Sequence, residues 1–334
     1  MTARAQLWQG GLDFTLIDIP LPELNTDELL VELTAATICG SDRHTVEGRR
    51  SSPCPSILGH EGVGVVVASR RATVPVGTRV VFSVTAVCGT CAMCTRGLTA
   101  KCTTVMKAGH EEYSSPWPLS GTYASHIHVV AGQEVVEVPD SVSDGAASTA
   151  GCAVATVMAV IEAAGDLSGK TVLVNGVGML GLIACAAARG HGAAEVIGCD
   201  PNESSSSIAH GVVDRLVRTV GDVKVDVVLE LSGARQGVID SVAALKVGGI
   251  AVLAGSVTPT KPINLDPEWL VRGWRTITGV HNYEPRHIKQ AVDFLVTFGS
   301  VLPWGRILGG PIPLADLPIA FAHPDGAMRT IVVP

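Results

Sequence analysis

Hydrophobic positions in roughly the first 140 residues fall in short runs that Gly and Pro interrupt. Short runs rich in Val, Ile and Leu are typical of β-strands. They cover residues 29–36, 62–69, 78–84, 127–130 and 135–139. The pattern predicts a compact, mostly β domain.

From about residue 144 the pattern changes to an Ala-rich helical stretch, followed by strands that alternate with helices. Strands are predicted at 171–175, 194–200, 226–231 and 248–256, and helices at 179–190 and 234–246. Such alternation indicates a parallel sheet with right-handed crossovers. Later in the chain we expect one amphipathic helix at 285–299, Pro-rich loops and a final strand at 330–333. The four serines at 204–207 suit a solvent-facing turn or the start of a helix.

Length and composition narrow the class of protein. A chain of 334 residues, with 47% hydrophobic and 16% charged residues, is long enough for two domains and is neither disordered nor fibrous. Its net charge of −7 offers no attraction to nucleic acid. The N-terminus does not resemble a signal peptide, and two uncharged runs, 145–161 and 171–188, suit buried elements better than membrane spans. We expect a cytoplasmic protein without a nucleic-acid or membrane partner.

A glycine-rich turn joins the strand at 171–175 to the helix that follows it. Gly176, Gly178 and Gly181 form G-x-G-x-x-G, and Asp200 ends the next strand, 24 residues after Gly176. In dinucleotide sites these glycines allow a tight turn, approach to the pyrophosphate and close helix packing, while the acid binds the adenosine ribose. The alternative is a glycine-rich turn without a ligand. Because an acid repels a 2′-phosphate, and neither Pro201 nor Asn202 supplies an arginine, the motif favours NAD over NADP.

Four of the nine cysteines lie within 15 residues of one another, as Cys88, Cys91, Cys94 and Cys102. Four thiolates close a tetrahedral zinc shell, so this spacing predicts a structural zinc site. An iron-sulfur cluster and reduced, metal-free cysteines are the alternatives. Disulfides are not expected in a reducing compartment.

A second set is dispersed along the chain: Cys39 in ICGSD, His60 and Glu61 in LGHEGVG, and Cys152 in AGCAVAT. Taken singly, each suits an ordinary core residue. Together with the four-cysteine loop and the glycine-rich turn, in this order and over nearly the whole chain, they resemble the zinc-dependent medium-chain alcohol dehydrogenases.

The resemblance implies an α/β fold: a GroES-like β domain from 1–152 and 280–334, and a Rossmann domain, a doubly wound parallel sheet that binds NAD, from 153–279. It also implies two zinc ions per chain and a homodimer or homotetramer. The implied catalytic zinc ligands are Cys39, His60 and Cys152, with a fourth position open.

The same resemblance assigns roles to residues around that metal. It implies that Asp42 orients His60, that Glu61 lies behind the metal, and that Ser41 and His44 relay the alcohol's proton. Arg329, in the terminal MRTIVVP, falls where the family places a pyrophosphate-binding arginine.

Candidate substrate residues follow the relay histidine and the four-cysteine loop. Arg49 and Arg50 stand in EGRRSSP where the family has an apolar wall, and Lys107 and His110 stand in VMKAGHEE. A pocket-facing arginine implies an anionic ligand, whereas a solvated surface pair is the alternative. Likewise His110 and Glu111 could lie on the surface and resemble metal ligands without binding a metal. Three buried-type residues, Trp117, Leu119 and Tyr123, could be pocket wall or ordinary core.

Short strings such as GLTAKC, KAGHE and GVHNYEP resemble a subgroup described as phosphonate-catabolism-associated alcohol dehydrogenases. This suggests a hydroxyalkyl-phosphonate or similar anionic alcohol as substrate. The alternatives are a polyol or simple-alcohol dehydrogenase, a zinc-free reductase of the same superfamily, and a non-catalytic nucleotide-binding protein. The zinc-free reductases lack the ligands that positions 39, 60 and 152 supply here.

Overall fold

The computed structural model describes residues 1–334, which divide into two units. Unit 1 comprises Met1–Cys152, Glu284–Val296 and Trp304–Pro334, and unit 2 comprises Ala153–Tyr283 and Thr297–Pro303. The chain thus returns to the first unit at Glu284, close to the residue 280 expected from the sequence, and residues 297–303 belong to the second unit.

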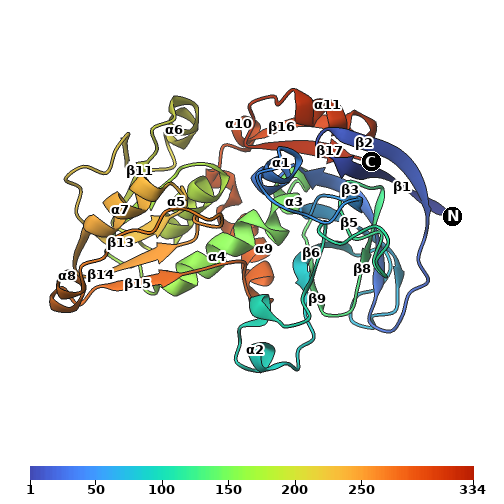
Figure 1. The fold of residues 1–334 in the computed structure, drawn as a ribbon, viewed down its shortest axis with the longest axis horizontal. Coiled ribbons are helices and arrows are strands. Elements are labelled where there is room, and N and C mark those ends of the chain that lie inside the picture. The colour runs from blue at the N-terminus through green and yellow to red at the C-terminus, as the bar shows by residue number, and fades with distance from the viewer. The chain divides into compact units, whose positions relative to one another are not determined.

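Unit 1 is built on an eight-stranded sheet around β3 (Leu29–Thr37), which pairs with β5, β8 and β17. Its other strands are β5 (Gly62–Ser69), β6 (Arg79–Ala86), β7 (Met106–Lys107), β8 (His126–Val129), β9 (Gln133–Glu137), β16 (Leu308–Pro313) and β17 (Arg329–Val333). Figure 1 shows β17, from the end of the chain, beside strands from its beginning. Buried Phe82, Trp117 and Ile127 form part of the core.

A second, three-stranded sheet in unit 1 has the order β2-β1-β4, with β1 at Thr2–Gly10, β2 at Asp13–Pro20 and β4 at Ser56–Ile57. Short helices complete the unit: α1 (Gly40–Val46), α2 (Ala92–Thr95), α3 (Asp144–Ser148), α10 (Trp304–Ile307) and α11 (Leu317–Ala322). The 3-10 turns here are η1 (Thr99–Lys101), η2 (Thr149–Gly151) and η4 (Leu314–Asp316).

Unit 2 holds a six-stranded parallel sheet of order β12-β11-β10-β13-β14-β15. The strands are β10 (Thr171–Asn175), β11 (Glu195–Cys199), β12 (Arg215–Val217), β13 (Val225–Glu230), β14 (Leu245–Leu253) and β15 (Thr276–Gly279). This is the doubly wound order of dinucleotide-binding folds, in which the chain starts at the centre and winds outward both ways.

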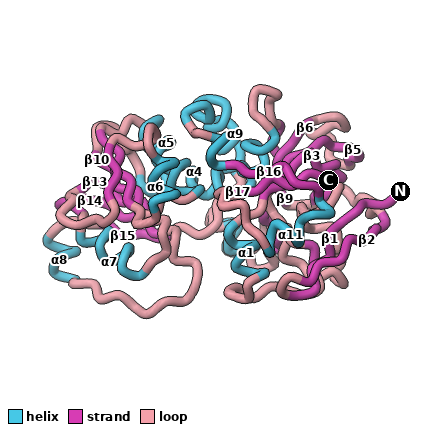
Figure 2. The backbone as a smooth tube through the Cα atoms, turned by 90° about the horizontal axis from the view of Figure 1, so that it is seen from above, coloured by secondary structure: helices cyan, strands magenta, loops and turns pink.

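Helices cover both faces of this sheet, as Figure 2 shows for α5 and α7. They are α4 (Ala153–Ala164), α5 (Met179–Gly190), α6 (Glu203–Ala209), α7 (Arg235–Ala243) and α8 (Pro267–Arg272). Helix α9 (Arg286–Phe298) begins in unit 1 and ends in unit 2, followed by η3 (Gly299–Val301). The core under the sheet includes Leu173, Ile197 and Val228.

The predicted strands and helices are confirmed, and the serine run lies in the first turns of α6. The prediction of loops alone between 300 and 328 was wrong, because β16, α10 and α11 lie there. β16 is an edge strand, which tolerates the prolines of LGGPIP that make a strand hard to recognise. The strands β1 and β2 were also not predicted.

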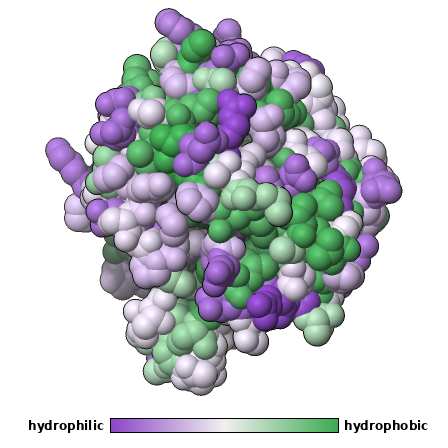
Figure 3. Space-filling model, turned by 90° about the vertical axis from the view of Figure 1, so that its right-hand side faces the viewer, coloured by the Kyte–Doolittle hydropathy of each residue, from purple (hydrophilic) through white to green (hydrophobic).

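No single helix is long and apolar enough to cross a membrane. Two consecutive helical segments, Asp144–Gly151 and Ala153–Ala164, would together be long and apolar enough, but the chain bends by 54° between them. The face drawn in Figure 3 carries separate hydrophobic patches among hydrophilic residues.

Candidate functional site

Cys39 lies where strand β3 ends and helix α1 begins. Its backbone N–H donates to Asp42 Oδ2 at 2.9 Å, and the Asp42 N–H donates back to the Cys39 carbonyl at 3.1 Å. This reciprocal pairing satisfies N–H groups that a helix start leaves free. The Cys39 thiol, 7% exposed, is thereby fixed at the first turn of α1.

His60 follows Gly59, which has a φ of +89° and no room for a side chain, since a Cβ there would lie 2.5 Å from Thr122 Oγ1. His60 Nδ1 lies 3.3 Å from Asp42 Oδ1, which leaves Nε2 for another partner. Burial disfavours a charged imidazole, but the Asp42 carboxylate and the Cys39 thiol together outweigh burial and raise the pKa of His60. Ser41 Oγ lies 3.4 Å from Nε2.

Cys152 completes a triad of possible metal ligands. It follows η2, where a Cβ on Gly151 would lie 2.5 Å from the Phe82 carbonyl oxygen, so this close approach requires glycine. The ligand atoms of Cys39, His60 and Cys152 all lie within 4.8 Å of one another. Hydrogen bonding between the two thiols lowers the pKa of Cys39 and raises that of Cys152. Two sulfurs and one imidazole nitrogen fit zinc with one open position.

Behind this triad lies a buried ion pair. The Nε of Arg329 donates to Glu61 Oε2 at 2.8 Å, and its Nη2 lies 3.4 Å from the Cys39 sulfur. Glu61 also accepts from Thr37 Oγ1 at 2.7 Å. Burial raises the pKa of Glu61. Arg329 is 5% exposed, and its partners are Glu61, Cys39 and the Met328 carbonyl oxygen. Its binding of a pyrophosphate stays a prediction.

The four other cysteines also converge, with Cys88, Cys91, Cys94 and Cys102 within 4.8 Å of one another. N–H groups of Cys94 and Thr103 lower the pKa of Cys91 to about 5, which favours the thiolate form that binds metal. Four sulfurs fit a closed zinc shell. The contact that anchors this loop was not predicted: Glu284 accepts from Thr99 N at 3.0 Å and from Thr99 Oγ1 at 2.7 Å.

In unit 2, the glycine-rich turn lies at the carboxyl end of β10. Gly176 has a φ of +90°, and a Cβ on Gly181 would lie 1.8 Å from the Gly176 carbonyl oxygen. Nothing lies within 4 Å of where a Gly178 Cβ would point. The turn therefore leaves open space at the N-terminus of α5, which fits the pyrophosphate of a dinucleotide.

Asp200 lies beside this turn, where its Oδ2 accepts from Val177 N at 3.0 Å. Sequence reasoning missed Arg218, which follows β12 and donates to the Pro201 carbonyl oxygen at 3.1 Å. Its other partner is Glu203, at 2.6 Å. Only the pairing of β11 with β12 brings residue 218 close to Asp200, so no local pattern could reveal it.

The candidate substrate residues differ in their surroundings. Arg49 is 60% exposed and pairs with Glu47, as a solvated residue does. Arg50 is half-buried, makes no ion pair, and acts electrostatically on both Lys107 and His110. Burial, followed by the charge of Arg50, lowers the pKa of Lys107.

His110 lies beside the metal ligands, because its ring centroid is 5.4 Å from that of His60. Gly109 makes this approach possible, since a Cβ there would lie 2.2 Å from the Gly59 carbonyl oxygen. Burial and the charges of His60 and Arg50 lower the pKa of His110 to about 4, and its Nδ1 lies 2.8 Å from the Ala108 carbonyl oxygen. At neutral pH His110 therefore offers hydrogen bonding rather than charge.

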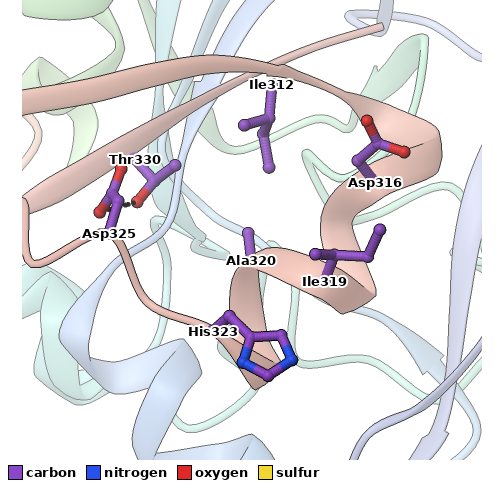
Figure 4. A pocket seen from close by; sticks show the side chains of 7 residues that line it. All are labelled: Ile312, Asp316, Ile319, Ala320, His323, Asp325 and Thr330. Atoms are coloured by element: carbon purple, nitrogen blue, oxygen red, sulfur yellow. Dashed lines mark hydrogen bonds between the residues drawn. The ribbon is translucent and has the colours of Figure 1, made fainter.

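The three residues that could be pocket wall or core are core, since Trp117, Leu119 and Tyr123 are 2%, 1% and 0% exposed. Tyr123 does more than pack, because its hydroxyl donates to Asp42 Oδ2 at 2.8 Å. A separate hollow of about 200 Å³ contains none of the predicted site residues (Figure 4). It is lined by Ile312, Asp316, Ile319, Ala320, His323, Asp325 and Thr330.

Comparison with known proteins gives two family matches. The sequence model of the alcohol dehydrogenase GroES-like domain matches residues 25–140, and that of the zinc-binding dehydrogenases matches residues 180–297. L-threonine 3-dehydrogenase from Aeromonas hydrophila is 30% identical over 274 residues, 75% of each chain. The enzyme of that name from Enterobacter sp. (strain 638) is 29% identical over 291 residues, 80% of this chain and 81% of the relative.

Solved structures show the same fold. An alcohol dehydrogenase from Thermotoga maritima superposes with a TM-score of 0.92 at 24% identity, over 100% of both chains. A zinc-binding dehydrogenase from Sinorhizobium meliloti, solved with NADP bound, has a TM-score of 0.89 at 24% identity, again over 100% of both chains.

The two cysteine sets should respond differently to substitution. Cys152→Ser or Cys39→Ser should remove one of two zinc ions per chain and abolish alcohol turnover, with a modest change in melting temperature. Cys91→Ser should lower the melting temperature, because a closed four-thiolate site contributes folding free energy. Elemental analysis measures the zinc content of each variant, and thermal unfolding measures its melting temperature. A single zinc per purified chain, with turnover intact in Cys152→Ser, would contradict the catalytic assignment.

Two glycines of the same turn provide a second test. Gly181→Ala should lower the melting temperature, because its methyl group collides with the Gly176 carbonyl. Gly178→Ala, which meets open space at a φ of −67°, should fold normally and yet weaken NAD binding by about tenfold, or about 1.4 kcal/mol. Calorimetric titration with NAD measures the second effect. Unchanged NAD affinity in Gly178→Ala would mean that the pyrophosphate lies elsewhere.

Proposed function

Because this chain belongs to the zinc-dependent medium-chain dehydrogenases, we propose that it oxidises an alcohol that carries an anionic group, with NAD as the hydride acceptor. The observation that carries the substrate class is the half-buried Arg50, which has no ion pair and lies within electrostatic range of Lys107 and His110. Because the His110 ring lies beside that of His60, the positive charges of Arg50 and Lys107 lie near the metal ligands.

An unpaired cation that is partly removed from water favours a ligand with the opposite charge. The guanidinium of Arg50 can bind two oxygens of a phosphonate, phosphate or carboxylate at once, and Lys107 adds a second positive charge. Neutral His110 can bind a further polar atom. An alcohol with an anionic group at one end suits these residues better than a plain hydrocarbon alcohol.

L-Threonine, the substrate named for two relatives, is the second candidate, because its carboxylate would suit Arg50. Its ammonium group suits this site less well. The two acids beside the metal ligands already have partners: Asp42 contacts His60 and Tyr123, and Glu61 pairs with Arg329. A second positive charge, from Lys107, would repel the ammonium. We therefore favour a hydroxyalkyl-phosphonate or a hydroxy acid over an amino acid.

The protein's own groups have distinct tasks in this proposal. Zinc held by Cys39, His60 and Cys152 would supply a Lewis acid that eases loss of the alcohol's proton. Asp42 keeps Nε2 of His60 directed at the ligand position by engaging Nδ1. Ser41, 3.4 Å from that Nε2, would take up the alcohol's proton as it gives up its own hydroxyl proton, and His44, on the same helix, would carry a proton toward solvent.

We also propose a homodimer or homotetramer. In unit 2 the edge strand β15 has one free side, and Trp274 just before it is 86% exposed. Val247 and Val271, 73% and 69% exposed, also belong to this unit. Large exposed apolar side chains near a strand edge favour association with another chain.

The substrate class is tested by comparing the two arginines. Arg50→Ala should raise KM for 2-hydroxyethylphosphonate by at least about tenfold, since hydrogen bonds to charged groups contribute about 1.5–3 kcal/mol. KM for a neutral alcohol of similar size should change little. Arg49→Ala is the matched control, and it should have a small effect because exposed ion pairs contribute about 0–1 kcal/mol. Reduction of NAD followed at 340 nm measures each.

Two outcomes would contradict the proposal. The wild-type enzyme could prefer neutral alcohols, with Arg50→Ala losing nothing on anionic ones. Alternatively, L-threonine could exceed both the phosphonate and matched hydroxy acids in kcat/KM, which would favour the second candidate.

The cofactor preference rests on Asp200, which should favour NAD over NADP through ribose hydrogen bonds and repulsion of a 2′-phosphate. Asp200→Ala should narrow this preference. With the repelling carboxylate gone, the nearby Arg218 would be the charge that attracts a 2′-phosphate, so the double variant Asp200→Ala, Arg218→Ala should lose the gain in NADP turnover. Equal wild-type kcat/KM for both cofactors would overturn the role of Asp200.

A further inference from the structure

Glu230 is the last residue of β13, at the carboxyl edge of the parallel sheet. Strands β10 and β13 are neighbours at the centre of the order β12-β11-β10-β13-β14-β15, where the chain's two halves wind apart. In folds of this order a dinucleotide lies across that point, with its adenosine half on the side of β11 and its nicotinamide half on the side of β13. Glu230 therefore lies at the base of the expected nicotinamide half.

The Glu230 side chain is fully buried and gathers donors from the segment that follows it. Its Oε1 accepts from the backbone N–H of Ser232 at 3.0 Å, from the Ser232 hydroxyl, and from the N–H of Gly233 at 3.1 Å. Its backbone carbonyl accepts from Ala254 N at 2.9 Å and Gly255 N at 3.0 Å. One residue thus joins the ends of β13 and β14 and fixes the 231–233 segment.

That segment has no room to shift. A Cβ on Gly176 would lie 2.7 Å from Ser232 N, and a Cβ on Gly233 would lie 2.4 Å from the Gly255 carbonyl oxygen. The first glycine of the dinucleotide motif is therefore in direct backbone contact with the segment that Glu230 holds. Residues 231–233 therefore form the wall of this turn on the β13 side, which is the side of the expected nicotinamide half, and their movement would disturb that half of the site.

The charge balance around Glu230 is unusual for a buried acid. Its Oε2 is buried without a hydrogen-bond partner, and no cation pairs with the side chain. Burial raises its pKa, which the hydrogen bonds from Ser232 and Gly233 oppose. A buried acid without a counter-ion is costly, and an uncharged side chain at this position would avoid that cost, so the presence of Glu230 points to the groups that its hydrogen bonds hold.

We propose that Glu230 is a positioning residue for the nicotinamide half of the dinucleotide, because its carboxyl group holds the 231–233 segment against the glycine-rich turn. The inference rests on the proposed function. Glu230 would act from beneath the site, because its side chain is fully buried.

Calorimetric titration of the purified protein with NAD and with AMP, which has only the adenosine half, tests this role. Glu230→Ala should raise the Kd for NAD about tenfold or more, as expected for loss of several hydrogen bonds, and change the Kd for AMP by less than about twofold. Glu230→Gln keeps an acceptor oxygen for Ser232 and Gly233, so its affinity for NAD should be close to that of the wild type. The control Glu268→Ala alters a 71% exposed acid of the same unit and should change neither Kd.

Equal weakening of NAD and AMP binding in Glu230→Ala would indicate a general structural role and overturn the inference, as would unchanged NAD binding. If Glu230→Ala does not fold, Ser232→Ala takes its place, because it removes one of the three donors and should weaken NAD more than AMP. Wild-type protein that binds neither ligand would instead overturn the proposed function.

Discussion

The carboxylate of Asp42 is the contact on which the arrangement of the metal ligands depends. It is 3% exposed, accepts hydrogen bonds from the N–H of Cys39 and the hydroxyl of Tyr123, and lies 3.3 Å from Nδ1 of His60. Each group left without a partner in such a buried place costs about 1–3 kcal/mol, so the three contacts favour one geometry strongly. Two ligands that are 21 residues apart in sequence are therefore oriented by one side chain between them.

A second layer of charge supports the first. Glu61 and Arg329 are both buried and neutralise one another beneath the thiol of Cys39. Removing one partner of such a buried pair typically costs about 3–5 kcal/mol, because the remaining charge has lost both water and its counter-ion. Because each buried charge has a partner, the contacts of Asp42 and the Glu61–Arg329 pair allow several ionisable groups to be buried together without unfolding the domain.

The sequence was sufficient to predict those parts of the site in which the chemistry requires particular residues at a fixed spacing. The four-cysteine loop and the glycine-rich turn are recognisable because each residue type is required at its position, whereas the dispersed triad of ligands could be assigned only through the resemblance to a known family. Strand β1 was missed because its inward positions include Ala3 and Ala5, which lack the bulk that makes strands recognisable. The partners of Arg329 and Arg218 could not be predicted, because only the pairing of distant strands brings these residues to their sites.

The pairing of β17 with β3 sets a constraint on the order in which the protein can form during synthesis. Ile331 and Val332 lie opposite Thr37 and Ala36, so the ribosome makes one side of this contact almost 300 residues before the other. Until Arg329 emerges, Glu61 has no counter-ion, and burying it would be unfavourable. Contacts so distant in the chain form late. Of the two units, the first therefore begins to be made earlier, and it completes its sheet only after the parallel sheet of the second has been synthesised.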